Sequence, residues 1–451
     1  MQQNTPGRWS NIPFSPKRWP FYYGWAIMIV STLGVIASIP GQTMGVGVFT
    51  DHLIASLKLS RTELSTAYMI GTLGSSFLLP FAGDLVDRFG ARVSVVWAAI
   101  GLGLSLVFLS KTPLTLAIDI SYLPVSIIFI AATFCFLFMR FFGQGCLTMI
   151  SRVLIGKWFN HKRGLATGIS GVFVAFGFNA SPMFLNHIVS ALDWQNACLL
   201  LALLVGGGMT LLGWLFYRDN PEACGLIMDG AKDQDTYDKI ASKIPETRRE
   251  YTRRQALRTY EFWVFSIAIG TVGLIITAAT FHIASIGSEM GLSKETAYSL
   301  FMPMAFFSIA ANFLSGWISD RVRHRWLIMA MMIAQLLAVL GLTMLDTAFG
   351  RWLFFGGQGS AAGMFVALST VVLPRFFGRT HLGSISGANF SIMVFASAMG
   401  PVLFSLGQDL TGSYKEIILI FGLLPFLLAA AALKVRNPQD RNLFRPDRKP
   451  E

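Results

Sequence analysis

The sequence contains unusually little charge. Asp, Glu, Lys and Arg make up only 13% of its 451 residues, whereas 53% are hydrophobic and the mean hydropathy is +0.57. A soluble domain of ordinary composition has about 25% charged residues. A chain with this composition cannot cover a folded core with polar side chains. The composition therefore excludes an ordinary soluble protein and predicts one that crosses a membrane several times.

Cysteine is also scarce, and its spacing argues against two kinds of site. Of the four cysteines, three fall inside apolar runs and none forms a C-x-x-C pair, so we expect neither a disulfide nor a metal site. The sequence likewise lacks a nucleophile–base pair, a nucleotide-binding loop and a cluster of metal ligands. We therefore expect a protein that is not an enzyme and that uses no cofactor.

A cleavable targeting segment is missing as well. The first twenty residues contain Arg8, Lys17 and Arg18, but no short apolar segment followed by small residues. The apolar run that follows them is long, which predicts a signal anchor that stays in the protein.

Long apolar runs are abundant. A helix needs about 20 apolar residues to cross the hydrocarbon of a bilayer. Twelve runs reach or approach this length, at residues 23–49, 64–82, 93–109, 122–155, 165–189, 197–217, 262–286, 297–318, 326–345, 352–373, 385–406 and 417–435. We predict an all-α, polytopic membrane protein with twelve transmembrane helices.

Lys and Arg are concentrated on one side of these helices. Most of the 36 lie at the termini, in the central polar gap and in the links that follow even-numbered helices, and only Arg140 is expected in the middle of a span. By the positive-inside rule, this bias predicts that both termini are cytoplasmic and that the protein is a multi-pass protein of the cytoplasmic (inner) membrane. Because this distribution explains the net charge of +12, we expect the lipid bilayer as a partner and no nucleic acid.

Short motifs recur in the two halves of the chain. FGQGC at residues 142–146 recurs as GGQGS at 356–360. Duplicated halves around a central cavity are a common architecture of secondary transporters. We expect two pseudo-symmetric six-helix bundles, at residues 1–217 and 262–451. The linker between them, at 218–261, is expected to be a solvated cytoplasmic tether with a short surface helix.

The densest cluster of charge between two apolar runs is GDLVDRFGAR at residues 83–92. It matches the pattern G-x-L-x-D-R-x-G-x-R, and GWISDRVRHR at residues 316–325 is a looser second copy. The pattern resembles the signature loop between the second and third helices of the major facilitator superfamily. The resemblance implies that superfamily's twelve-helix fold and alternating-access transport of a small organic solute.

The resemblance also implies a cytoplasmic gate. The residues expected in it are Gly83, Asp84, Asp87, Arg88, Gly90, Arg92, Asp320 and Arg321. Gly83 and Gly90 allow close backbone approach. Asp87 is expected to face the N-terminal end of a helix from the other half, near Gly383, where backbone N–H groups favour an anion. The alternative is that these charges only set the membrane topology.

Other links resemble those of monocarboxylate porters and oxalate:formate antiporters. One example is KWFNHKRGLATG at residues 157–168, which is similar to the pattern W/Y-F-x-x-x-R-x-x-A-x-G. This resemblance implies a mono- or dicarboxylate substrate, with a proton or an exchanged anion as the coupled species. Transport of a neutral or amphiphilic compound is the alternative, and a receptor that transports nothing is a third reading.

Arg140 and His282 are titratable candidates inside the spans. An uncompensated Arg within a membrane costs about 3 kcal/mol on insertion scales, so Arg140 is expected to face a wet cavity or an interior partner. It is a candidate for anion binding or coupling, or else for capping backbone carbonyls. The pKa range of His282 suits proton coupling, but a lone His in an apolar run is more often a packed, hydrogen-bonded residue.

The second half offers polar but uncharged candidates, namely Ser308, Asn312, Gln358 and Asn389. By the resemblance, carboxylate transporters have an Arg where this chain has Asn312. A carboxylate without a fixed cation would lose a charge-assisted hydrogen bond worth about 1.5–3 kcal/mol. Either Arg140 binds an anion, or these polar residues bind a solute that is not anionic. The alternative for each is a contact between helices.

Overall fold

The structure is a computed structural model that describes residues 11–113, 127–231, 233, 235 and 249–440. Regular structure in these residues is helical. The helices of the first half are α1 (Gly24–Ala37), α2 (Thr43–Leu57), α3 (Arg61–Lys111), α4 (Ile127–Met139), α5 (Thr148–Trp158), α6 (Arg163–Leu192), α7 (Trp194–Leu201) and α8 (Thr210–Phe216). Those that follow are α10 (Arg253–Ala256), α11 (Tyr260–Glu289), α12 (Lys294–Ser299), α13 (Phe301–Ile318), α14 (His324–Leu342), α15 (Ala348–Phe377), α16 (Leu382–Thr411) and α17 (Tyr414–Ala432).

Twelve membrane-spanning segments can be traced through the described residues. Ten continuous helical stretches are long and apolar enough to cross a membrane. One of them, α3, contains two spans in succession, and α1 and α2 together form one broken span that is too short in either part. The all-α fold with twelve transmembrane segments is therefore the one that the apolar runs predict.

The expected loop at residues 83–92 is instead almost entirely helical. Within α3, only Gly90 leaves the helical conformation, with φ +81° and ψ 164°. That region of backbone space favours glycine because it has no Cβ. The helix restarts at Ala91, whose N–H donates to the carboxylate of Asp219 at 3.0 Å. A single kinked residue therefore turns the chain from the second span into the third.

The first span is broken where a continuous helix was expected. A short 3-10 turn, Ile39–Gly41, separates α1 from α2. Pro40 in this turn has no N–H to donate and interrupts the helical ladder. A Cβ on Gly41 would lie 2.3 Å from the carbonyl oxygen of Met139, so only glycine fits there. The break packs against a π-helical segment of the fourth span, Arg140–Leu147, which lies between α4 and α5.

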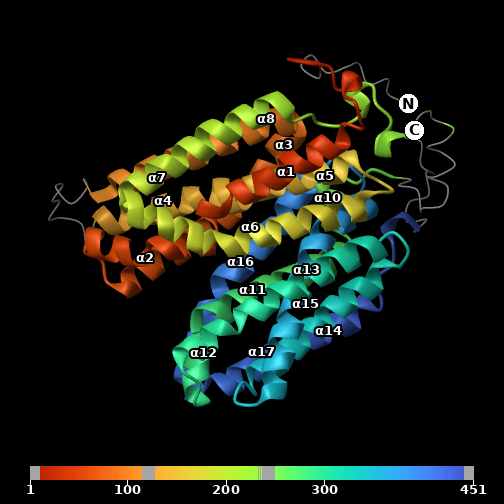
Figure 1. Cartoon of the computed structure of the whole chain (residues 1–451). Helices are drawn as coiled ribbons and strands as arrows, with labels where there is room; N and C mark the ends of the chain where they lie inside the picture. Colours follow the sequence, from red (N-terminus) through yellow and green to blue (C-terminus); the bar gives the residue numbers. More distant parts are fainter. Residues whose placement is uncertain (1–10, 114–126, 232, 234, 236–248, 441–451) are drawn as a thin grey trace, which may run out of the picture.

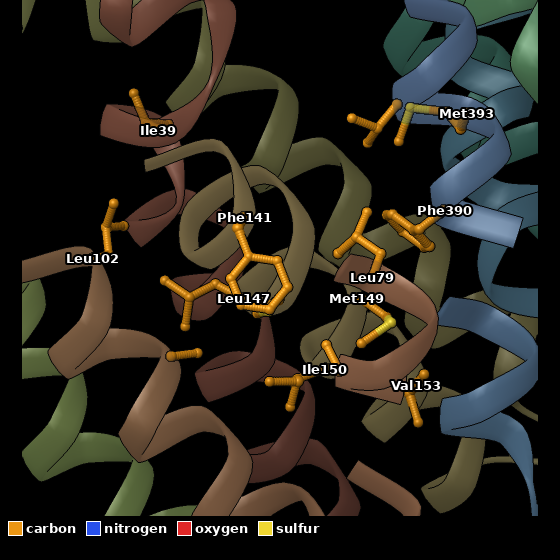
Figure 2. Packing of buried hydrophobic residues seen from close by; sticks show 14 of the residues in the cluster. Ile39, Leu79, Leu102, Phe141, Leu147, Met149, Ile150, Val153, Phe390 and Met393 are labelled. Carbon is orange, nitrogen blue, oxygen red and sulfur yellow. The ribbon is translucent and has the colours of Figure 1, made fainter. Parts of the chain in front are cut away.

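The helices form two groups, which we name the first group (α1–α8) and the second group (α11–α17). The groups meet toward the face that carries both chain ends, hereafter the terminal face, and diverge away from it (Figure 1). The longest contacts between them run along α3 with α16 and along α6 with α13. Buried side chains continue the core across this junction, and Figure 2 shows Leu79 and Met149 of the first group near Phe390 of the second.

Candidate functional site

A cavity of about 900 Å³ lies between the two groups. Its volume is within the range of small-molecule sites. The polar residues in its lining are Gln42, Thr43, Thr50, Asp51, Ser65, Gln144, Thr148, Arg152, Thr277, Thr280, Ser308, Asn312 and Ser397. Aromatic side chains from both groups cover much of the remaining wall, namely Tyr68, Phe136, Phe178, Phe281, Phe365 and Phe390. The site therefore combines a polar strip with apolar surfaces.

Arg152 is the one basic residue among the described residues of the cavity lining. It extends from α5 across to the second group, where its guanidinium donates to the hydroxyl of Ser369 at 2.5 Å. The same guanidinium lies over two rings, 5.2 Å from the centre of Phe365 and 5.7 Å from that of Phe390. Aromatic faces attract a cation in this geometry. The second group therefore holds Arg152 in place inside the cavity.

Sequence reasoning missed Arg152 because it grouped this residue with the basic link after the fourth span. The structure corrects that assignment, since α5 continues to Trp158 and Arg152 lies inside the helix. Its position within the apolar run 122–155 was a signal that could have identified it.

Arg140 lies behind the cavity wall and is not part of the lining. Its side chain is 1% exposed. It donates to the carbonyl of Gly41 and to the hydroxyl of Thr43, both at 3.3 Å, and lies 5.2 Å from the ring centre of Tyr68. Backbone carbonyls that a helix break frees inside a membrane need such a donor. The geometry corresponds to the capping alternative, and Arg140 orients Thr43 and Tyr68, which do line the cavity.

Two of the four uncharged candidates face the cavity. Ser308 and Asn312 of α13 are both in the lining. Asn312 is 2% exposed, and its side-chain oxygen has no hydrogen-bond partner among the described residues. Its amide lies directly on Gly171 of α6, where a Cβ would be 1.5 Å from the Asn312 nitrogen. Asn312 thus presents an unused acceptor at the junction of the two groups.

The other candidates pair with neighbouring helices away from the cavity. Gln358 of α15 accepts a hydrogen bond from Gln335 of α14 at 3.0 Å. Asn389 of α16 donates to Ser266 of α11 at 2.9 Å. His282 contacts the carbonyl of Pro401 at 3.0 Å and the hydroxyl of Tyr414 at 3.1 Å, through its two ring nitrogens. These contacts correspond to the helix-contact alternative.

The terminal face is closed by a contact that the signature motif predicts. The carboxylate of Asp87 accepts hydrogen bonds from the backbone N–H groups of Gly383 at 2.8 Å and Ser384 at 2.7 Å. These groups open α16, so the charge lies at the positive end of a helix dipole. Gly83 permits the approach, because a Cβ on it would lie 2.4 Å from the Gly383 carbonyl oxygen. The role of this contact in gating stays a prediction.

The other charged residues of the first motif also contact neighbouring residues near this face. Asp84 forms an ion pair with Arg253 at 2.7 Å. Arg92 is buried and donates to the carbonyls of Tyr217 at 3.0 Å and Ile12 at 2.9 Å, so it holds the N-terminal segment against the first group. The Arg88 guanidinium lies 5.3 Å from the ring centre of Phe89.

The second motif makes a different set of contacts. Asp320 forms an ion pair with Arg375, and burial raises the pKa of the Asp320 carboxyl while Arg375 and Arg163 oppose that shift. Arg321 lies 4.1 Å from the ring centre of Trp317. The close helix approach is nevertheless repeated here, because a Cβ on Gly164 would lie 1.8 Å from the carbonyl oxygen of Gly316.

The linker is more than the solvated tether expected from the sequence, in the part that the structure describes. The carboxylate of Asp229 accepts hydrogen bonds from the backbone N–H groups of residues 160–162, just before α6. Arg253 donates to the carbonyl of Pro80 at 3.0 Å. The short surface helix that was expected in the linker is present as α10. The described part of the linker therefore packs against the terminal face.

The cavity extends toward the face opposite the chain ends. Its lining includes Thr50, Asp51 and Ser65, which lie toward the ends of α2 and α3 that point away from the terminal face. The Asp87 contact lies at the opposite, terminal face, so the two groups meet differently at the two faces of the molecule.

Comparison with known proteins agrees with this architecture. The chain is 22% identical to monocarboxylate transporter 13 of Bos taurus, over 95% of this chain and 93% of that protein. It is 21% identical to the oxalate:formate antiporter of Oxalobacter formigenes, over 89% and 88% of the two chains. The fold matches that of the proton:xylose symporter XylE with a TM-score of 0.65 and 17% identity, over 91% and 95% of the chains. The sequence model of the Major Facilitator Superfamily matches residues 21–401. The chain therefore belongs to the Major Facilitator Superfamily.

Proposed function

We propose that this protein transports a small mono- or dicarboxylate by alternating access and that Arg152 binds the carboxylate. The observation that carries the proposal is the position of Arg152, a cation inside the cavity that lies between the two groups. Two relatives at low identity, a monocarboxylate transporter and an oxalate:formate antiporter, support the substrate class.

Guanidinium is well suited to this role. Its planar fork of donors can bind both oxygens of a carboxylate, and such charge-assisted bonds are stronger than neutral ones. Phe365 and Phe390 lie against the Arg152 guanidinium and also line the cavity, so they offer an apolar surface to the rest of the solute. Asn312, with its unused acceptor, can bind a hydroxyl or a protonated carboxyl. Arg152 would thus supply the positive charge that carboxylate transporters have at the position of Asn312.

Transport would proceed by relative movement of the two groups. The moving bodies would be residues 1–217 and 262–451, joined by 218–261. In the state described here, the contact of Asp87 with α16 closes the terminal face. When that contact opens and the opposite face closes, the solute would be released at the terminal face. A proton or an exchanged anion would be the coupled species. The basic charge at the terminal face favours a cytoplasmic location for that face.

The test compares Arg152→Gln and Arg152→Lys with the wild type in proteoliposomes, using counterflow of labelled mono- and dicarboxylates. Loss of a charge-assisted bond of about 1.5–3 kcal/mol would weaken binding roughly 10- to 150-fold. We expect that loss in Arg152→Gln and a partial loss in Arg152→Lys. Wild-type counterflow in Arg152→Gln would contradict the assignment of Arg152, and the absence of counterflow with every acid would contradict the substrate class.

The aromatic wall of the cavity favours a second candidate, which is transport of a neutral or amphiphilic compound. Ligand-induced thermal stabilisation separates the two, since a ligand that binds the folded state raises its melting temperature. Stabilisation by organic acids in the wild type and not in Arg152→Gln supports the carboxylate. Stabilisation by apolar amines alone supports the second candidate.

A further inference from the structure

A second cavity, of about 650 Å³, lies on the terminal face beside the Asp87 contact. Its lining is Asp84, Thr252, Arg253, Arg254, Leu257, Arg258, His381 and Ser384. These residues come from α3 of the first group, from the linker around α10 and from the start of α16. We name it the basic pocket.

The basic pocket carries more positive charge than its own residues neutralise. Its one carboxylate, Asp84, already pairs with Arg253 at 2.7 Å. The side chains of Arg254 and Arg258 are exposed, and their guanidinium groups form no hydrogen bond or ion pair within the part of the chain that the structure describes. Two guanidinium groups are therefore available to bind a phosphate or carboxylate group from outside the chain.

The surroundings of the basic pocket place it at the level of lipid headgroups. Tyr260 and Trp263, on the first turn of α11, are 40% and 45% exposed. Exposed Tyr and Trp at helix ends mark the membrane interface. The indole of Trp263 donates to the carbonyl of Leu257, a residue of the pocket itself, at 2.8 Å. The pocket therefore lies next to the interfacial layer.

An apolar surface extends from the basic pocket toward the membrane. Phe77 and Phe81 of α3 are 63% and 66% exposed, and at intervals of three to four residues they share a helix face with Asp84. On α16, Phe395 is 44% exposed and lies about three turns from Ser384, on the same face. The ring centres of Phe77 and Phe395 lie 6.2 Å apart. The outer side of the junction between α3 and α16 is thus lined with exposed aromatic rings.

We propose that the basic pocket binds the phosphate of an anionic phospholipid, with its acyl chains along the junction of α3 and α16. Basic residues at a membrane surface attract anionic lipids. Because both groups contribute to the pocket, a lipid bound in it stabilises the arrangement in which the terminal face is closed. A ligand that prefers one state shifts the equilibrium toward that state. Only this shift rests on the proposed alternating access, since binding itself does not depend on transport.

Binding is tested on the full chain in detergent by titration with dioleoyl phosphatidylglycerol, dioleoyl phosphatidylcholine and inorganic phosphate, with thermal unfolding as the readout. We expect phosphatidylglycerol to stabilise the wild type more than phosphatidylcholine does. Loss of two basic residues would weaken phosphatidylglycerol binding roughly 30-fold in the double variant Arg254→Gln/Arg258→Gln. The matched control Lys434→Gln/Arg436→Gln removes two exposed charges elsewhere on the terminal face and is expected to bind as the wild type does.

Three results would overturn the binding site. Equal stabilisation of the double variant and the wild type would show that the pocket is not involved. An equal loss in the control would show a general effect of surface charge. Stabilisation by inorganic phosphate as strong as that by the lipid would show a site for soluble anions.

The conformational effect is tested separately, by the rate at which a maleimide labels Thr50→Cys in the mouth of the central cavity. The four native cysteines are buried, so background labelling is expected to be low. Phosphatidylglycerol should raise the labelling rate at least threefold in otherwise wild-type protein and leave it unchanged in Arg254→Gln/Arg258→Gln. An unchanged rate in both would overturn the conformational effect while leaving the transport proposal untouched.

Discussion

At the scale of single residues, two arginines in the fourth span, Arg140 and the partly exposed Arg152, have different surroundings and therefore different expected roles. Arg140 binds the backbone where the first span breaks, and Arg152 binds side chains of the other group inside the cavity. The first contact stabilises the fold, whereas the second lies in the cavity where we propose that a solute binds. The two substitutions should therefore separate stability from substrate binding.

We expect Arg140→Met to lower stability and to leave selectivity among acids unchanged. Loss of its hydrogen bonds leaves the Gly41 carbonyl and the Thr43 hydroxyl without this donor, at a cost of about 1–3 kcal/mol. Arg152→Gln is the matched comparison, with weaker acid binding at nearly wild-type stability. Thermal unfolding with and without acids measures both quantities. Loss of acid binding in Arg140→Met at unchanged stability would show that Arg140 contacts the solute.

At the scale of helices, close packing at glycines sets how the two groups meet. Gly83 on α3 touches the backbone of α16, and Gly164 on α6 touches that of α13. Since backbone atoms cannot move aside as a flexible side chain can, a methyl group at either position must separate the helices. The close approach of α3 to α16 and of α6 to α13 therefore depends on glycine at these two positions.

Gly83→Ala is expected to open the terminal face. The added Cβ would lie 2.4 Å from the Gly383 carbonyl oxygen and 2.9 Å from the Ser384 Cα, so α3 must move away from α16. We expect maleimide labelling of Thr50→Cys to slow at least threefold in this background. Gly208→Ala is the control, because a Cβ there meets nothing within 4 Å. Equal labelling in both variants would show that the helices adjust without opening.

The helices also show what sequence could and could not predict. The contact of Asp87 with α16 was predictable because a contiguous motif carries it. The setting of Arg152 was not, since Phe365, Ser369 and Phe390 reach it only through folding of distant segments. Gln358 was predicted to bind substrate because the sequence around it does not reveal that Gln335, on another helix, is its hydrogen-bond partner. Apolar run length predicted the spans, but not the break at Pro40 or the kink at Gly90.

At the scale of the whole molecule, the proposed alternating access requires the contact at Asp87 to form and break. Asp87→Asn keeps the shape of the side chain and removes the charge that faces the start of α16. We expect the variant to fold and to lose at least tenfold in counterflow, because the closed terminal face is less stable. Asp440→Asn, at an exposed site, is the control. Wild-type counterflow in Asp87→Asn would refute the gating role.

The two attachments of the linker have a mechanical consequence. Near its start, Asp229 binds the turn before α6, and near its end the N–H of Tyr251 donates to the carbonyl of Phe377 at 2.9 Å. Each end is therefore fixed to a different group. In the proposed transport cycle, the length of chain between these two anchors limits how far the two groups could separate.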